Sequence, residues 1–176
     1  MSKSTSQATT PLPDSRIAWD DAGHLDVITF NVGDECLAAE AVSVQEILDL
    51  LPETRVPGAP ALVASVVNFR GQIIPIADLR VAFGMPAEEP TVDSRIVVIE
   101  TEIEGEVTQI GLRTDKVHEV TSLSRADSSE PPPLGMRWPR HYVREFVRRD
   151  DGVIVLPDLP AIFATIKHET MRASAA

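Results

Sequence analysis

The sequence predicts a mainly β protein with short helices. Its apolar runs are short and rich in β-branched residues, as in Val27–Val32 and Ile96–Ile99, and turn residues separate them. The chain of 176 residues also holds 14 prolines, which leave little room for the long helices of a helical bundle. This length fits one domain or two small domains that pack tightly together.

Residues 1–24 are expected to form a flexible tail. They are rich in Ser, Thr, Gln and Pro and hold few sizeable apolar side chains, such as Ile17 and Trp19. Burial of so few apolar groups does not offset the entropy lost when the segment is ordered. The simpler interpretation of Ile17–Trp19 is a stretch that touches the domain surface, and a docking peptide is the alternative.

The first strand pair is expected at Val27–Val32 and Cys36–Ala38, because Gly33-Asp34 between them is a reversing turn. The stretch from Val42 to Leu51 fits either a helix or a strand. Pro75 cannot donate a ladder hydrogen bond, so its strand should be bulged or lie at a sheet edge. The remaining strands are expected at Val66–Val67, Gln72–Ile76, Ile96–Ile99, Val107–Leu112 and Val153–Leu156.

Two short helices follow strands. Asp78 is positioned to cap Leu79–Phe83, which ends at Gly84. Asp158 offers the same cap to Leu159–Phe163. Residues 166–176 are expected to be a C-terminal tail.

These two caps belong to an internal repeat. The segment Ile74–Leu79 matches Ile154–Leu159 at an offset of 80 residues, and Val44–Ile47 matches Val117–Val120 at an offset of 73. The repeat predicts two halves of like architecture, about 25–85 and 91–164. Each half is too small to bury its sheet alone, so we expect the two to pack together.

The charge restricts the classes of partner. Sixteen basic and 27 acidic residues give a formal net charge of −11, of which residues 1–90 carry −8 and residues 91–176 carry −3. Such a charge disfavours nucleic acid and anionic membranes as partners. With one cysteine, no apolar run of membrane-spanning length and no secretory signal, the chain is expected to be soluble and cytoplasmic.

Catalytic and metal sites find little support in the sequence. The four histidines are scattered, and Cys36 is interpreted as a structural thiol in preference to a nucleophile. The alternating glutamates of Glu100–Glu106 are read as a solvated edge with a hairpin tip, in preference to a cation site. The five arginines of Arg137–Arg149 form either a basic docking patch or, as the favoured alternative, a surface strand that neutralises nearby glutamates.

The densest local pattern is Val66–Arg80. Asn68 and Gly71 bracket a turn that is expected to hold Phe69 and Arg70 out from the sheet, with Gly71 supplying a positive φ. Arg70 is either an ordinary surface arginine or a charged anchor for another protein.

Together these motifs resemble the CheW-type coupling proteins of bacterial chemosensory systems. The resemblance runs from about Leu25 to Ala164. Its second half agrees more loosely, through Gly111-Leu112, Asp115, Glu119-Val120, Tyr142 and Asp158-Leu159. The motifs that carry it most strongly are Gly33-Asp34-Glu35, Val44-Gln45-Glu46-Ile47, Arg55-Val56-Pro57, Asn68-Phe69-Arg70-Gly71 and Asp78-Leu79-Arg80.

The resemblance implies one domain over 25–165, made of two packed SH3-like five-stranded β-barrels, with subdomain 1 at about 25–85 and subdomain 2 at about 91–164. It implies no enzymatic activity, no cofactor and no metal. It implies a cytoplasmic adaptor, recruited to membrane receptor arrays without inserting into the membrane. Its partners would be the regulatory domain of a chemotaxis histidine kinase and the cytoplasmic tips of chemoreceptors.

In such proteins one end of the first barrel joins the kinase, the groove between the barrels holds the receptor tip, and the second barrel closes rings in the array. The resemblance ties Val44, Glu46 and Arg70 to partner contacts, with Asn68 and Gly71 shaping the turn that presents Arg70. Two alternatives remain. One is the same adaptor in a pathway for pilus motility or second-messenger control, and the other is a β-barrel enzyme or small-ligand binder that uses Cys36 or the acidic strand.

Overall fold

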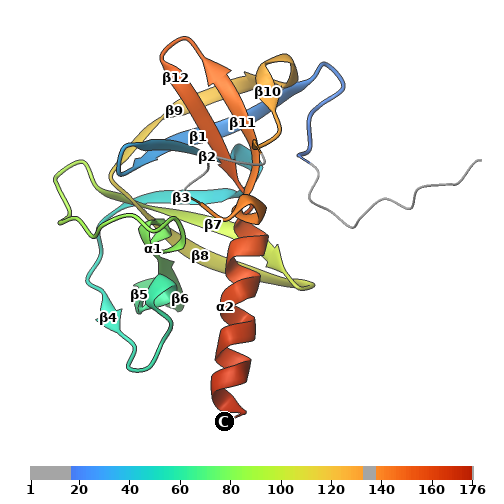
Figure 1. The fold of residues 1–176 in the computed structure, drawn as a ribbon. Coiled ribbons are helices and arrows are strands. Elements are labelled where there is room, and N and C mark those ends of the chain that lie inside the picture. The colour runs from blue at the N-terminus through green and yellow to red at the C-terminus, as the bar shows by residue number, and fades with distance from the viewer. Residues whose placement is uncertain (1–16, 133–137, 176) are drawn as a thin grey trace, which may run out of the picture.

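The computed structural model describes residues 17–132 and 138–175, and two curved β-sheets packed against each other form its body (Figure 1). We name them the upper and lower barrel after their places in that view. The upper barrel has the strand order β10 (Ser128–Ser129), β11 (Val143–Arg149), β12 (Gly152–Pro157), β2 (Glu35–Glu40), β1 (His24–Val32), β9 (Lys116–Ser124). The lower barrel has the order β4 (Thr54–Arg55), β5 (Ser65–Phe69), β6 (Gln72–Ala77), β8 (Glu106–Thr114), β7 (Arg95–Ile103), β3 (Val44–Asp49).

Each sheet consists of five strands of five or more residues and one two-residue strand at an edge. The prediction of a mainly β fold with two five-stranded barrels is therefore confirmed. Short helices lie between the strands, at η1 (Ala41–Ser43), η2 (Ala61–Val63), α1 (Leu79–Ala82), η3 (Arg125–Asp127) and η4 (Arg140–Tyr142), and a longer helix, α2 (Leu159–Ser174), follows the last strand.

The two barrels exchange hairpins. The first half of the chain runs β1 to β6 and then α1, and the second half runs β7 to β12 and then α2. The hairpin β1–β2 lies in the upper barrel with β9 to β12, whereas β7–β8 lies in the lower barrel with β3 to β6. The expected subdomains 25–85 and 91–164 therefore do not correspond to the sheets. A β-hairpin pattern fixes which two strands pair, but not which neighbouring sheet they join.

The internal repeat is visible in the strand pairing. Strands β6 and β12 occupy equivalent places, and each makes a parallel pairing, β6 with β8 and β12 with β2. Strands β3 and β9 are also equivalent. The register of β3 against β7 shifts after Val44, and that of β9 against β1 shifts after Val117, which is the matching position in the repeat. The sequence offsets of 80 and 73 thus correspond to equivalent elements.

Among the described residues, three clusters of buried side chains make up the core. The largest lies between the barrels and includes Phe30 and Leu37 of the upper sheet with Ile99 and Leu112 of the lower sheet. Phe163 of the helix α2 belongs to the same cluster. Smaller clusters fill each barrel, and burial of this branched apolar surface is the main favourable contribution to stability.

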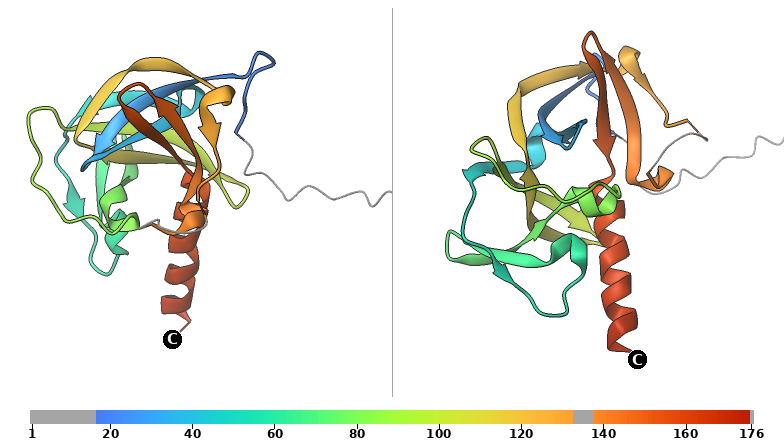
Figure 2. Two further views of the ribbon diagram at one scale, coloured as in Figure 1. Left: turned by 45° about the horizontal axis from the view of Figure 1, so that its top comes forward. Right: turned by 60° about the vertical axis from the view of Figure 1, so that its left-hand side comes forward.

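The helix α2 is much longer than the sequence suggested. Asp158 Oδ1 accepts a hydrogen bond from the Ala161 N–H at 3.0 Å, so the expected cap is present. The helix then continues to Ser174, and the segment 166–176 is mostly helix in place of the expected tail. After Pro160 the sequence contains no helix breaker, which explains the continuation. Figure 2 shows α2 descending beside the lower barrel, with its C-terminal end projecting from the body.

The N-terminal boundary of the domain also differs from the expected end of the tail at residue 24. Residues 1–16 of the expected tail lie outside the described residues. Ile17 and Trp19 pack against the core of the upper barrel, and β1 begins at His24. The stretch Ile17–Trp19 therefore touches the domain, as the simpler interpretation held.

Two further expectations are settled by the strand pairing. The ambiguous stretch from Val42 to Leu51 contains the strand β3, with alternating half-buried and exposed residues. Pro75 does not lie in an edge strand, because β6 lies between β5 and β8. The proline is tolerated there because the ladder with β8 involves only Ile76 and Ala77, after the proline.

Candidate partner-binding site

The turn between β5 and β6 presents Arg70. Arg70 and Gly71 form a two-residue hairpin loop with φ angles of 50° and 79°. Asn68 Oδ1 accepts a hydrogen bond from the Gly71 N–H at 3.0 Å, which fixes the loop from one side. The predicted roles of Asn68 and Gly71 in shaping this turn agree with this geometry. Phe69 does not point outwards as expected, because it is 8% exposed and packs inside the lower barrel.

Arg70 forms an ion pair with Glu46. The Arg70 Nη2 and Glu46 Oε2 atoms lie 2.5 Å apart, although their alignment does not satisfy a hydrogen bond. Glu46 lies on β3 at one end of the lower sheet, and Arg70 follows β5 near the other end. The pair therefore bridges the seam where the curved sheet closes. We call these two residues, with Asn68 and Gly71, the Arg70 corner.

The arginine is held in place and yet remains accessible. Its side chain is 74% exposed, against 33% for Glu46. The Arg70 guanidinium carbon lies 5.2 Å from the ring centroid of Phe69, within the range of a cation–π interaction. An arginine restrained on two sides loses less side-chain entropy when a partner binds, and this is what makes an anchor effective.

An exposed apolar side chain accompanies the corner. Ile73, 66% exposed, pairs with Asn68 across the hairpin. Ile47, 42% exposed, follows Glu46 on β3 and lies on the opposite face of that strand. An exposed charged group beside an apolar side chain is a common composition of a protein interface. Ile73 was not among the residues predicted from the sequence, although the period of two along β6 places it on the outward face.

Val44, the fifth predicted residue, is not part of the Arg70 corner. It begins β3, is half-buried and packs against the core between the barrels. The structure thus brings Glu46, Asn68, Arg70 and Gly71 together at one end of the lower barrel. It places Val44 where β3 leaves the junction of the barrels.

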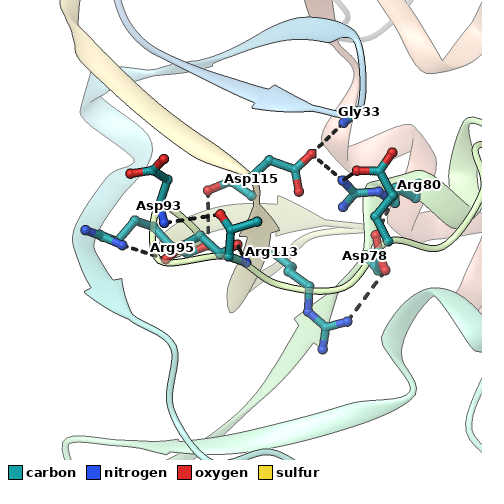
Figure 3. A network of polar contacts seen from close by, with 11 residues as sticks. Gly33, Asp78, Arg80, Asp93, Arg95, Arg113 and Asp115 are labelled. Atoms are coloured by element: carbon teal, nitrogen blue, oxygen red, sulfur yellow. Dashed lines mark hydrogen bonds and ion pairs between the residues drawn. The ribbon is translucent and has the colours of Figure 1, made fainter.

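A second polar network ties the two barrels together (Figure 3). Arg80 of α1 is 3% exposed and forms an ion pair with Asp115, which lies between β8 and β9. Asp115 Oδ2 also accepts a hydrogen bond from the Gly33 N–H at 2.7 Å, in the turn between β1 and β2. The hydrogen bond with Asp115 raises the pKa of Arg80. The Asp78-Leu79-Arg80 motif is thereby a structural feature: Asp78 caps α1, and Arg80 joins the barrels.

Cys36 lies in a hollow at the open end of the upper barrel, together with Asn31 and His118. His118 Nε2 lies 2.7 Å from Asn31 Oδ1, so this histidine is engaged with an amide. Burial raises the pKa of the Cys36 thiol, which reduces its thiolate fraction at neutral pH. These observations favour the structural interpretation of Cys36.

The acidic strand pair ends at a hairpin tip, as predicted, because Glu104-Gly105 joins β7 to β8. Glu104 Oε1 lies 2.8 Å from His168 Nε2 of α2, and Lys167 Nζ lies within 3.6 Å of both Glu104 and Glu106. The tip therefore contacts α2. In the part of the chain that the structure describes, no group of acidic, His or Cys side chains has the arrangement of a metal site.

The arginine-rich segment forms the strand β11, which was the favoured interpretation. Arg144 does not neutralise the nearby acidic strand, because its Nη1 pairs with Glu40 Oε1 at 3.1 Å. Arg148 and Arg149 are exposed at the end of β11. Arg137 lies outside the described residues. Among the residues described, no helix combines the length and the apolar composition needed to cross a bilayer.

Comparisons with known proteins agree with this architecture. The sequence profile of the CheW-like domain matches residues 26–167. The chain is 33% identical to the chemotaxis protein CheW of Rhizobium meliloti over 147 residues, which cover 84% of this chain and 92% of the relative. It is 30% identical to the probable chemotaxis protein CheW of Rhizobium etli over the same shares of both chains.

A solved structure shows the same fold. The crystal structure of the scaffolding protein TtCheW from Thermoanaerobacter tengcongensis superposes with a TM-score of 0.70 and 29% sequence identity, covering 79% of this chain and 92% of the other. The profile match covers most of the chain, and the relatives and the two barrels agree with it. This chain therefore belongs to the CheW family of chemotaxis adaptor proteins.

Proposed function

We propose that this chain couples chemoreceptors to a chemotaxis histidine kinase, and that the Arg70 corner is one of its partner contacts. The coupling role is inferred from membership of the CheW family. The observation that carries the assignment to this corner is an arginine, 74% exposed, held by an ion pair with Glu46 and flanked by exposed Ile73. As an adaptor, the protein would act by binding, recruited to membrane receptor arrays through the receptor tips.

Within the corner, the residues have different tasks. Arg70 contacts the partner, because its guanidinium offers directional hydrogen bonds to carboxylates or backbone carbonyls. Glu46 and Asn68 are positioning residues, since one pairs with the guanidinium and the other fixes the loop. Val44 supports β3 from the core side and would affect binding through the position of Glu46.

Binding to each partner tests the proposal. The purified chain is titrated calorimetrically against the regulatory domain of each chemosensory kinase of the cell, one at a time, and against a receptor cytoplasmic fragment. Arg70→Ala and Arg70→Glu should weaken binding to at least one partner by roughly 1 to 3 kcal/mol, the usual effect of losing an anchor. Arg172→Ala, which removes an exposed arginine from α2, is the matched control and should bind normally.

The two levels of the proposal fail separately. Failure of the wild-type chain to bind any of the kinases and the receptor fragment would overturn the coupling role. Normal binding by both Arg70 variants would overturn only the assignment of the corner. The kinase that binds also distinguishes flagellar chemotaxis from an adaptor of pilus motility or second-messenger control.

A further inference from the structure

The seam of a barrel is the line along which the two ends of its curved sheet meet. This seam is open in the upper barrel and closed in the lower barrel. Strand β9 lies at one end of the upper sheet, and β11 lies next to its other end (Figure 2). In the described part of the chain, β9 forms a ladder only with β1, so its second edge has no strand partner. An unpaired strand edge is a template for a further strand.

Two hollows follow this seam. One has a volume of about 850 Å³ and lies between residues 117–121 of β9 and the tip of the β11–β12 hairpin. The other, of about 420 Å³, continues it between residues 121–124 and the end of β11. Thr121 and Arg149 line both hollows, so the two form one continuous groove. At the far end the groove closes, because β10 pairs with Phe146 and Val147 of β11.

The internal repeat explains why one seam is open. In the lower barrel Leu48 and Phe69 fill the seam, and Arg70 pairs with Glu46 across it. The repeat offsets of 73 and 80 place Thr121 at the position of Leu48, Arg149 at that of Phe69, Asp150 at that of Arg70 and Glu119 at that of Glu46. The upper seam therefore has two acidic residues where the lower seam has an ion pair, and it has Arg149 in place of the aromatic side chain of Phe69.

The side chains at the groove indicate what fits there. Val120 and Val153 line it and are 62% and 48% exposed. Around them lie Glu119 and Asp151, with Asp127 and Asp150 further along, against two arginines, Arg148 and Arg149. A partner strand that alternates apolar and basic side chains would complement both the valines and the acidic excess.

We propose that this groove is a docking site for an extended segment of another protein, which adds as a strand to the free edge of β9. Its backbone pairs with β9, its apolar side chains contact Val120 and Val153, and its basic side chains face the acidic rim. This proposal does not depend on the coupling function, because it concerns the barrel opposite the Arg70 corner.

A model peptide tests the docking site. The probe is a capped octapeptide of alternating valine and arginine, titrated into the full chain by calorimetry, with backbone amide hydrogen exchange of residues 117–124 measured in parallel. We expect binding together with slower exchange in β9. The matched control is the same peptide with alternate backbone nitrogens methylated, which keeps its charge but removes ladder hydrogen bonds. It should bind at least tenfold more weakly.

Variants of the chain locate the site. The double variant Arg149→Phe/Asp150→Arg gives the upper seam the phenylalanine and the ion pair that close the lower seam. It should bind the peptide at least tenfold more weakly. Val153→Ser, which removes an apolar contact without adding charge, should also weaken binding, whereas Val107→Ser, at an exposed valine of β8 in the lower barrel, should not. Circular dichroism confirms that each variant is folded.

Three outcomes would overturn the proposal. The first is equal binding of the methylated peptide, which would indicate charge attraction alone. The second is equal binding of the peptide by the folded double variant Arg149→Phe/Asp150→Arg. The third is slower amide exchange on strands other than β9. Self-association of the chain through β9 without any peptide would assign the edge to a second copy and would contradict a foreign occupant.

Discussion

At the scale of single residues, the ion pair of the buried Arg80 with the half-buried Asp115 should contribute to stability. Arg80→Met leaves Asp115 without this cationic partner at the junction of the barrels, and should lower the free energy of unfolding by roughly 1 to 3 kcal/mol. Urea unfolding measures this loss. Arg148→Met, at an exposed position, should change the free energy of unfolding by less than about 0.5 kcal/mol. Similar losses from both variants would contradict the structural role of Arg80.

The thiol of Cys36 should react slowly. Burial raises its pKa, and only the thiolate attacks an alkylating reagent. Alkylation by iodoacetamide at neutral pH, followed by mass spectrometry, should be markedly slower in the folded chain than in urea. Equal rates in the two states would show that Cys36 is not protected.

Residue-scale chemistry could be predicted from sequence only where it is local. Asn68 and Gly71 were identified as turn residues because the hydrogen bond that joins them spans three positions. The partner of Arg70 was not identified, since Glu46 lies 24 positions earlier and meets it only when the sheet curves. Phe69 was wrongly expected outside, because the turn was placed one residue too early.

At the scale of elements, the contact between β6 and β8 depends on Gly111. A Cβ atom on Gly111 would lie 2.5 Å from Ile76 Cδ1 and 2.8 Å from Ile96 Cγ2. Gly111→Ala should therefore destabilise the chain by roughly 1 to 3 kcal/mol through overpacking. The repeat places Ala38 at the equivalent point of the upper barrel, where the extra methyl group is accommodated.

A second substitution tests the cause of that loss. Ile76→Val removes the Cδ1 atom, so the double variant Gly111→Ala/Ile76→Val should lose less stability than the sum of the two single variants. Unfolding in denaturant measures all three. Simple additivity would mean that the cost arises elsewhere.

The elements themselves were mostly predictable. Both capped helices, the Gly33-Asp34 turn and the Glu104-Gly105 tip follow from short-range patterns and are present. The length of α2 was not, because the expectation ended at the last residue of the repeat although the sequence beyond Phe163 favours helix. The assignment of hairpins to sheets depends on contacts between the barrels, which no local pattern contains.

At the scale of the whole molecule, Glu145 should make stability depend on pH. Burial raises the pKa of its carboxyl group above the ordinary value of 4.5. Between the unfolded and folded pKa values the folded chain binds more protons, so the free energy of unfolding falls as the pH rises through this window. Below the window this penalty is absent, and above it the penalty is complete.

Replacing that carboxyl group removes the penalty. Glu145→Gln should raise the thermal midpoint relative to wild type at pH 7 and leave the two equal near pH 4. Glu119→Gln, at an exposed position, is the control and should show no such divergence. A difference between Glu145→Gln and wild type that is the same at every pH would point to a cause other than ionisation.

The exchanged hairpins make the molecule a candidate for a split protein. A cut in the connection between α1 and β7, at residues 86–93, would leave each fragment holding a hairpin that belongs in the other fragment's sheet. Each piece alone would lack two strands of its barrel, whereas the two together would supply every strand. Fragments 1–89 and 90–176 should therefore fail to fold singly and reassemble when mixed, so that the chain is two barrels by shape but one folding unit.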